Sequence, residues 1–139
     1  MPNEITFNPT GEKLNVDIQV TGLVIVSYSL RLWSVSPPEE KVVQEEIGNN
    51  LQSHDDFFWL RNKSQDHLPE EVAKNNGRIV ELISTVNTNK DEVEYTIKMV
   101  FSQGDNRDQQ TPLEDVFIKR TIKKSDGHHP SLYAILKAQ

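Results

Sequence analysis

The residues best suited to chemistry stand together in SHDDFFWL, residues 53–60. His54 beside Asp55 or Asp56 could act as an acid–base pair, because a histidine and a carboxylate can exchange a proton near neutral pH. One hypothesis is therefore a small hydrolase or isomerase. Without a supporting catalytic motif, we interpret the three residues as a solvated loop whose carboxylates could cap the turn that follows.

Three consecutive aromatic residues come next, in a chain where aromatics make up 7% of residues. Burying three rings contributes several kcal/mol at roughly 25 cal/mol per Å2. We therefore predict that this segment packs in the core or forms a short edge strand. In a strand, Phe57 and Trp59 share one face, and Phe58 and Leu60 share the other. The alternative is that one pair forms an exposed platform for a partner or a sugar.

The pair His128-His129 in SDGHHP, with Asp126 nearby, could offer nitrogen and oxygen ligands to a metal ion. Adjacent residues of a strand point to opposite faces, and the spacings HExxH and HxH are missing. Asp-Gly is above all a turn dipeptide, so we predict a hairpin loop here. We expect neither a metal site nor a cofactor.

Two polar stretches, residues 87–94 and 104–110, contain enough oxygen ligands to suggest calcium. Neither fits the EF-hand loop, and each contains a lysine or an arginine, so we interpret both as polar turns. Four basic residues also gather in one run, where strand geometry would place Arg120 opposite Lys119 and Lys123. We interpret that run as a solvated sheet face rather than a nucleic-acid groove. Its members are Lys119, Arg120, Lys123 and Lys124.

The net charge, the cysteine count and the lengths of the apolar stretches argue against several classes of protein. The net charge of -6 argues against nucleic acid as a partner. The chain has no cysteine, which excludes disulfides, cysteine nucleophiles and thiolate metal sites. No apolar stretch is long enough for a membrane span, and the N-terminal residues lack the pattern of a signal peptide. We expect one β-rich domain over residues 1–139, located in the cytoplasm and not in a membrane.

Alternation of apolar and polar residues predicts most of the secondary structure. It runs through residues 13–20 and then 22–35, where Tyr28 and Trp33 fall on opposite faces. The link Thr21-Gly22 fits either a tight turn or a bulge in one bent strand. Because residues 22–26 are apolar on both faces, we predict a central strand there rather than an edge strand.

The same pattern continues toward the C-terminus. Residues 77–86 and 93–102 alternate on either side of the polar link NTNKDE, and we predict that they form a hairpin. Residues 113–124 form a further predicted strand, and residues 131–138 form the last, which ties down the end of the chain. Three apolar side chains of the 113–124 run are expected to point inward: Val116, Ile118 and Ile122.

Two segments carry helix signals. Ser36, Pro37 and Glu39 fit a capping box with proline in the first turn. Val43, Ile47 and Leu51 follow at intervals of four, so the pattern predicts an amphipathic helix over about 37–51. A possible second, shorter helix covers about 69–75, with Gly77 as the residue that ends it.

These elements predict a mainly β fold with six to eight strands. We expect an antiparallel β-sandwich or a strongly curved sheet, with a half-open barrel around the helix as the alternative. The chain contains no GxSxG, P-loop or GxGxxG motif.

Our leading hypothesis is a non-catalytic protein–protein interaction or assembly module that binds a protein partner or a further copy of itself. The first alternative is a small-ligand or carbohydrate-binding domain that uses tryptophan and tyrosine rings, with Trp33, Trp59 and Tyr28 as candidates. The second alternative is the small enzyme with a His/Asp acid–base site. The residues singled out as possible ligand or partner contacts are Trp33, Phe58, Trp59, His54 and Asp55.

Overall fold

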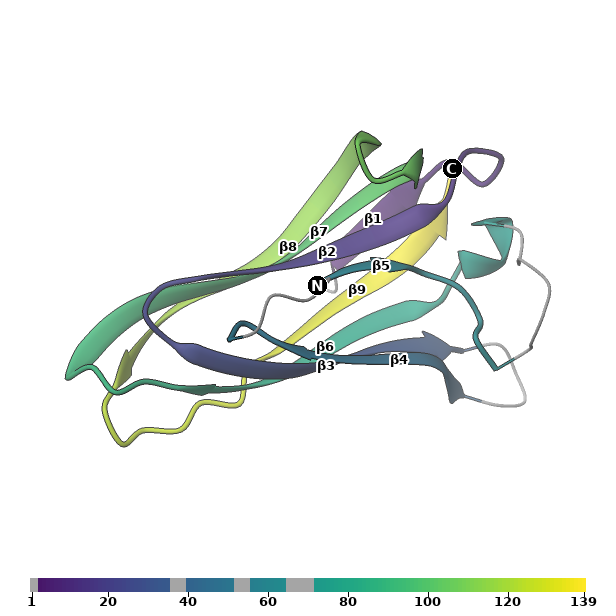
Figure 1. Ribbon diagram of the computed structural model, residues 1–139. Coiled ribbons are helices and arrows are strands. Elements are labelled where there is room, and N and C mark those ends of the chain that lie inside the picture. The colour runs from purple at the N-terminus through teal and green to yellow at the C-terminus, as the bar shows by residue number, and fades with distance from the viewer. Residues whose placement is uncertain (1–2, 36–39, 52–55, 65–71) are drawn as a thin grey trace.

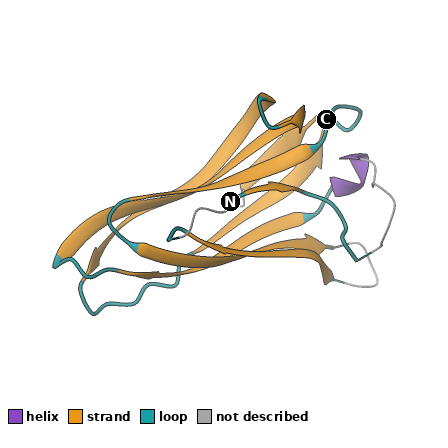
Figure 2. Cartoon of the chain, in the orientation of Figure 1, coloured by secondary structure: helices purple, strands orange, loops and turns teal. Residues whose placement is uncertain are grey.

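The computed structural model describes residues 3–35, 40–51, 56–64 and 72–139. These residues form strands and one short 3-10 helix, arranged in two layers (Figures 1 and 2). In chain order the elements are β1 (Asn3–Phe7), β2 (Leu14–Thr21), β3 (Ile25–Ser34), β4 (Lys41–Asn49), β5 (Phe57–Trp59), η1 (Val72–Asn75), β6 (Ile79–Asn87), β7 (Glu92–Asn106), β8 (Gln109–Lys123) and β9 (Ser131–Ala138).

The strands divide between two sheets that lie against each other in a sandwich-like arrangement. The five-stranded sheet has the order β1-β9-β6-β3-β4, and the four-stranded sheet has the order β5-β2-β7-β8. All neighbouring strands are antiparallel except β1 and β9, which are parallel. The prediction of a mainly β, largely antiparallel fold is confirmed. The predicted number of strands was too low, because β1 and β4 were not recognised.

The core lies between the sheets and consists of the side chains that the alternation assigned to it. Every second residue of β2, β3, β6, β7 and β9 is buried or partly buried there, and the inward residues of β8 pack against the same cluster. The predicted inward positions Val116, Ile118 and Ile122 are confirmed. β3 has a neighbour on each side, as predicted for a central strand.

The predicted helix over about 37–51 is wrong. Residues 41–49 form the edge strand β4, which pairs with β3. The capping signal lies at residues 36–39, which are outside the described part of the chain. Val43, at 3% exposed, and Ile47, at 77% exposed, do not share a face. Within the described residues no helix reaches seven residues. Of the possible second helix over about 69–75, residues 69–71 lie outside the described part of the chain, and residues 72–75 form the 3-10 helix η1.

The predicted hairpin of residues 77–86 and 93–102 is also wrong. β6 pairs with β3 and β9, whereas β7 pairs with β2 and β8 in the other sheet. The connection therefore crosses from one sheet to the other. The link through Gly22 between β2 and β3 also crosses, and is neither a hairpin turn nor a bulge in a single strand.

Residues 124–130, which join β8 to β9, also cross from one sheet to the other, so the predicted hairpin loop at His128-His129 is wrong. The three connections, residues 22–24, 88–91 and 124–130, lie together, and we call this part of the molecule the crossing end (Figure 1). Two hydrogen bonds join neighbouring connections, one from Thr88 Oγ1 to Leu23 O at 2.9 Å and one from Lys124 N to Asp91 O at 3.2 Å.

Candidate functional site

The aromatic segment is a short strand at the edge of the four-stranded sheet. β5 pairs with β2 alone, with Phe58 opposite Val16 and Trp59 opposite Asn15. Val16 belongs to the core, so this register turns Phe58 inward, where it packs against the core. Leu60 is buried just beyond it. The prediction of a short edge strand is confirmed, and the ring of Trp59 points outward from the sheet.

Cations of the chain itself cover the outward rings of β5. Lys13 Nζ lies 4.4 Å from the centroid of the Trp59 ring, and Arg61 Cζ lies 4.0 Å from it. Arg107 Cζ lies 5.3 Å from the centroid of the Phe57 ring. A cation at these distances is attracted to the aromatic face. The indole is therefore already engaged, which weakens the case for a stacking platform for a sugar.

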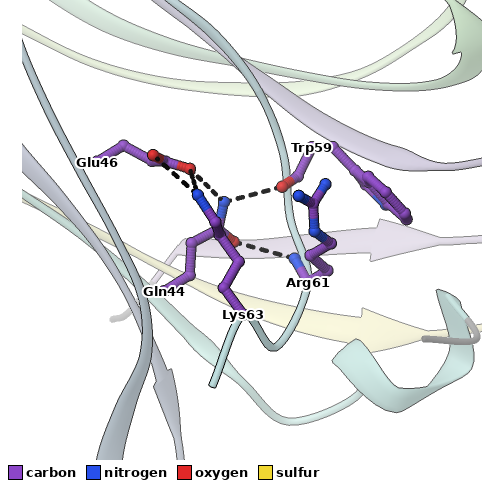
Figure 3. Close-up of polar contacts among 5 residues, drawn as sticks. All are labelled: Gln44, Glu46, Trp59, Arg61 and Lys63. Atoms are coloured by element: carbon purple, nitrogen blue, oxygen red, sulfur yellow. Dashed lines mark hydrogen bonds and ion pairs between the residues drawn. The ribbon is translucent and has the colours of Figure 1, made fainter. Parts of the chain in front are cut away.

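Polar contacts from side chains of β4 to residues 59–63 close the open edge between β4 and β5, and we call the residues involved the seam: Gln44, Glu46, Trp59, Arg61 and Lys63 (Figure 3). Gln44 is central and buried, with Nε2 donating to Trp59 O at 2.8 Å and to a Glu46 oxygen at 3.0 Å. Its Oε1 accepts from Arg61 N at 2.9 Å. Lys63 Nζ lies 3.2 Å from the same glutamate. The seam binds the two sheets together without a strand pairing between them.

Replacing Gln44 with alanine is expected to lower the free energy of unfolding by about 1–3 kcal/mol, because it leaves a carbonyl and an amide of the 59–61 segment without their partner. The measurement is urea unfolding, with an unchanged m-value as the sign that the fold is retained. Gln19→Ala, at an exposed position of β2, is the matched control and is expected to change stability by less than ~0.5 kcal/mol. Equal effects of the two substitutions would contradict the role of the seam.

Trp33 lies on the outer face of the five-stranded sheet. The core side chains of β3 occupy even-numbered positions, so the odd-numbered residues point away from the core. Across the sheet Trp33 stands opposite Val42 on one side and Ile79 on the other, and Ile79 stands opposite Ile135. The result is an apolar row that crosses four strands, β4, β3, β6 and β9. The indole Nε1 donates to Glu81 Oε1 at 3.1 Å.

Two more rows continue this outer face. In the next row, Arg31 Nε lies 2.9 Å from Glu45 Oε2 and Glu81 stands opposite Tyr133. Hydrogen bonding to Glu81, together with the negative charge of that residue, raises the pKa of the Tyr133 hydroxyl. The third row has two isoleucines that alternate with two serines across the same four strands. Its members are Ile47, Ser29, Ile83 and Ser131.

Exposed large hydrophobic side chains gather on the five-stranded sheet. Six such side chains are present in the described residues. Three belong to the strands of this sheet, and two more lie just before β3 and just after β4. They are Ile25, Ile47 and Tyr133 within the strands, and Leu23 and Leu51 beside them, whereas Phe117 of β8 lies on the other sheet.

The outer face of the four-stranded sheet is more polar. Its cross-strand neighbours include Gln19 opposite Lys98 and Thr96 opposite Lys119. The same lysine lies 3.2 Å from Glu94. Lys119 and Lys123 are exposed on this face, which is consistent with the prediction that the basic run of residues 119–124 belongs to a solvated sheet face. The two outer faces of the molecule therefore differ in character, one rich in exposed apolar side chains and the other largely polar.

The structure does not bring the proposed ligand-binding rings together. Trp33 and Trp59 point outward from different sheets, and Tyr28 is buried between the sheets with its hydroxyl donating to Asp56 Oδ1. A cavity of about 380 Å3 borders this tyrosine and the carboxylate, and it reaches neither tryptophan. His54 and Asp55 lie outside the described residues, so their proposed roles stay predictions.

Among the described residues, no group of three or more histidine, cysteine, aspartate or glutamate side chains is placed to hold a metal ion. The polar stretch 104–110 contains the turn between β7 and β8. The stretch 87–94 contains one of the sheet-crossing connections.

Sequence reasoning missed the outer face of the five-stranded sheet as a candidate surface. The sequence did contain an indication of an apolar outer face, because residues 79–83 read IVELI and are apolar on both faces of the strand apart from the glutamate. No helix of the described chain has the length and apolar character needed to cross a membrane. Comparisons with protein-family models, with curated proteins and with solved structures find no match, so the candidate surface stands on its geometry alone.

Proposed function

We propose that this chain is a non-catalytic assembly module that pairs with a second copy of itself through the outer face of its five-stranded sheet. The observation that carries the proposal is the gathering of exposed hydrophobic side chains on and beside that face. Contiguous exposed apolar surface is uncommon on monomeric proteins and is typical of interaction sites. A polar outer face on the opposite sheet leaves one surface of the molecule suited to apolar association.

The size of the face supports a stable interface. β3, β6 and β9 contain 10, 9 and 8 residues. At a strand spacing of about 4.8 Å and a rise of about 3.3 Å per residue, these strands and β4 cover roughly 20 by 30 Å, and the five-residue β1 extends that area at one edge. That flat area approaches the ~800 Å2 that each partner buries in a standard interface, and side-chain relief adds to it.

Charge favours a second copy as the partner. The chain carries a net charge of -6, which opposes the approach of two copies in most orientations. On this face, however, Arg31 lies beside Glu45, and Lys137 Nζ lies 3.4 Å from Glu4. Such internally paired charges require no opposite charge from a partner. A self-complementary, nearly neutral apolar face meets the requirement of a two-fold interface, in which each copy offers the same residues.

Sedimentation equilibrium on the unmodified chain, over a range of concentrations and at two salt concentrations, tests the proposal. We expect a mass that approaches twice that of the single chain as concentration rises. Added salt is expected to strengthen association or leave it unchanged, because salt screens the repulsion between two acidic chains. A single-chain mass at every concentration would contradict the proposal, as would a dimer that salt dissociates.

A further inference from the structure

One arginine occupies a position that the pattern of its strand assigns to an apolar residue. In β8 the inward positions hold Val116, Ile118 and Ile122, and Arg120 takes the remaining place in that series. It stands directly opposite Tyr95 of β7, whose side chain is buried. The guanidinium therefore lies on the inward side of the sheet, at the crossing end, where the sandwich opens to solvent.

A cleft with a volume of about 360 Å3 lies beside this arginine. The residues lining it come from β7, β8 and the 124–130 connection, and they are Tyr95, Arg120, Gly127, His128, His129 and Pro130. The connection is held in place on both sides. His128 exchanges two backbone hydrogen bonds with Val86 of β6, and its Nδ1 lies 2.9 Å from the Tyr95 hydroxyl. The walls of the cleft are thus fixed by both sheets.

The lining of the cleft is rich in groups that bind anions. It contains a guanidinium and two imidazoles and no carboxylate. Asp126 belongs to the same connection and is not among the lining residues. Within the described residues, Arg120 forms no hydrogen bond or ion pair, whereas its neighbour Lys119 is paired with Glu94 on the outer face. An inward guanidinium without a protein carboxylate has its five donors available to an oxyanion.

We propose that this cleft binds the phosphate group of a small phosphomonoester, with Arg120 as the main ligand-binding residue and the His128 and His129 imidazoles as further partners. The guanidinium presents paired N–H donors that match two phosphate oxygens. The volume lies in the range of small-molecule pockets and exceeds the need of a bare phosphate, which favours an organic ester. This inference is independent of self-association, because the cleft lies at the crossing end and not on the outer face of the five-stranded sheet.

Amide chemical-shift titration of the unmodified chain with phenyl phosphate, inorganic phosphate and chloride at matched ionic strength tests the inference. We expect saturable shifts around residues 127–130 with both phosphates and none with chloride. Tighter binding of phenyl phosphate assigns an ester as the source of the phosphate. Equal binding keeps the phosphate site and assigns free phosphate instead.

Arg120→Gln is expected to weaken phosphate binding by about tenfold to a hundredfold, the range for losing charge-assisted hydrogen bonds. Lys119→Gln removes the same charge from the adjacent residue on the opposite face, and it is expected to change binding less than about twofold because the salt-screened charge is remote. The side chain of Arg120 is exposed, so the variant is expected to fold, which its melting temperature checks.

Absence of saturable shifts, or equal losses in the two variants, would overturn the inference. So would an Arg120→Gln chain that binds phosphate normally and instead aggregates, because inward charges on edge strands also prevent aggregation.

Discussion

Ile47→Glu is expected to convert the proposed dimer into monomers, with a rise of more than about 100-fold in its dissociation constant. Ile47 is 77% exposed in the single chain and lies opposite Ser29 in a row that continues to Ile83. In the dimer a glutamate there would lose its hydration without gaining a partner. Sedimentation equilibrium of the variant beside the unmodified chain measures the change.

The matched control is Phe117→Glu, which places the same charge on an exposed apolar residue of β8 in the four-stranded sheet. We expect this variant to associate as the unmodified chain does. Both side chains are exposed in the single chain, so neither substitution is expected to change the melting temperature of the monomer by more than a few degrees. If the control dissociates and Ile47→Glu does not, the interface lies on the other sheet.

Gly22→Ala is expected to lower the free energy of unfolding by at least ~3 kcal/mol, because overpacking and backbone strain add. Gly22 makes the crossing from β2 to β3 with a φ of +110°, which side-chain-bearing residues rarely adopt. An added Cβ would lie 2.5 Å from the Glu94 carbonyl oxygen and 3.0 Å from Tyr95 Cα. Both atoms belong to the backbone of β7, the neighbour of β2 in the same sheet, so relief requires the start of the β2–β3 crossing to move away from β7.

Substitutions at two other glycines distinguish backbone strain from overpacking as causes of the lower stability of Gly22→Ala. Gly77 has a φ of +86° but open space where a Cβ would stand, so Gly77→Ala is expected to cost about 1–2 kcal/mol from the backbone alone. The Cβ position of Gly127 has its nearest atom at 3.9 Å, and Gly127→Ala is expected to stay within ~0.5 kcal/mol. Chemical denaturation measures all three. A Gly22→Ala chain no less stable than Gly77→Ala would contradict the close approach of Gly22 to the backbone of β7.

Strands whose alternation is strict were predictable from the sequence. Through residues 16–20 of β2 and 93–101 of β7 each second residue is buried or partly buried, because one face meets the core and the other is more exposed. β1 was not predicted because it is only five residues long and because it pairs, in parallel, with β9 at the far end of the chain. A pairing over that separation leaves no local signal.

β4 was mistaken for a helix because a spacing of four fits both structures. Val43, Ile47 and Leu51 would form a helical stripe, but an interval of four is also a multiple of the strand period of two. The neighbouring Val42 and Val43 are β-branched and favour a strand. Pairing with β3 is a tertiary interaction, and it makes this segment a strand rather than a helix. A register irregularity opposite Leu32 and Trp33 then turns Val43 inward and Ile47 outward.

The sheet-crossing connections were mistaken for hairpins because a short polar link looks the same in both. Residues 88–91 could join neighbouring strands or opposite sheets, and only the pairing partners of β6 and β7 distinguish the two. The candidate surface was hidden for a related reason. Trp33 was singled out from the sequence, but Ile79 and Ile135 join it only through the strand order of the five-stranded sheet. The separation of Trp33 from Trp59 likewise follows from the topology.

An isotope-filtered NOE experiment on a dimer assembled from equal amounts of 13C-labelled and unlabelled chains tests the proposed interface most directly. We expect intermolecular NOEs to the methyl groups of Ile47, Ile79 and Ile83, which lie on the outer face of the five-stranded sheet. We expect none to the methyl groups of Val100, on the outer face of the four-stranded sheet. Intermolecular NOEs at Val100 together with none at the three isoleucines would contradict the proposed interface.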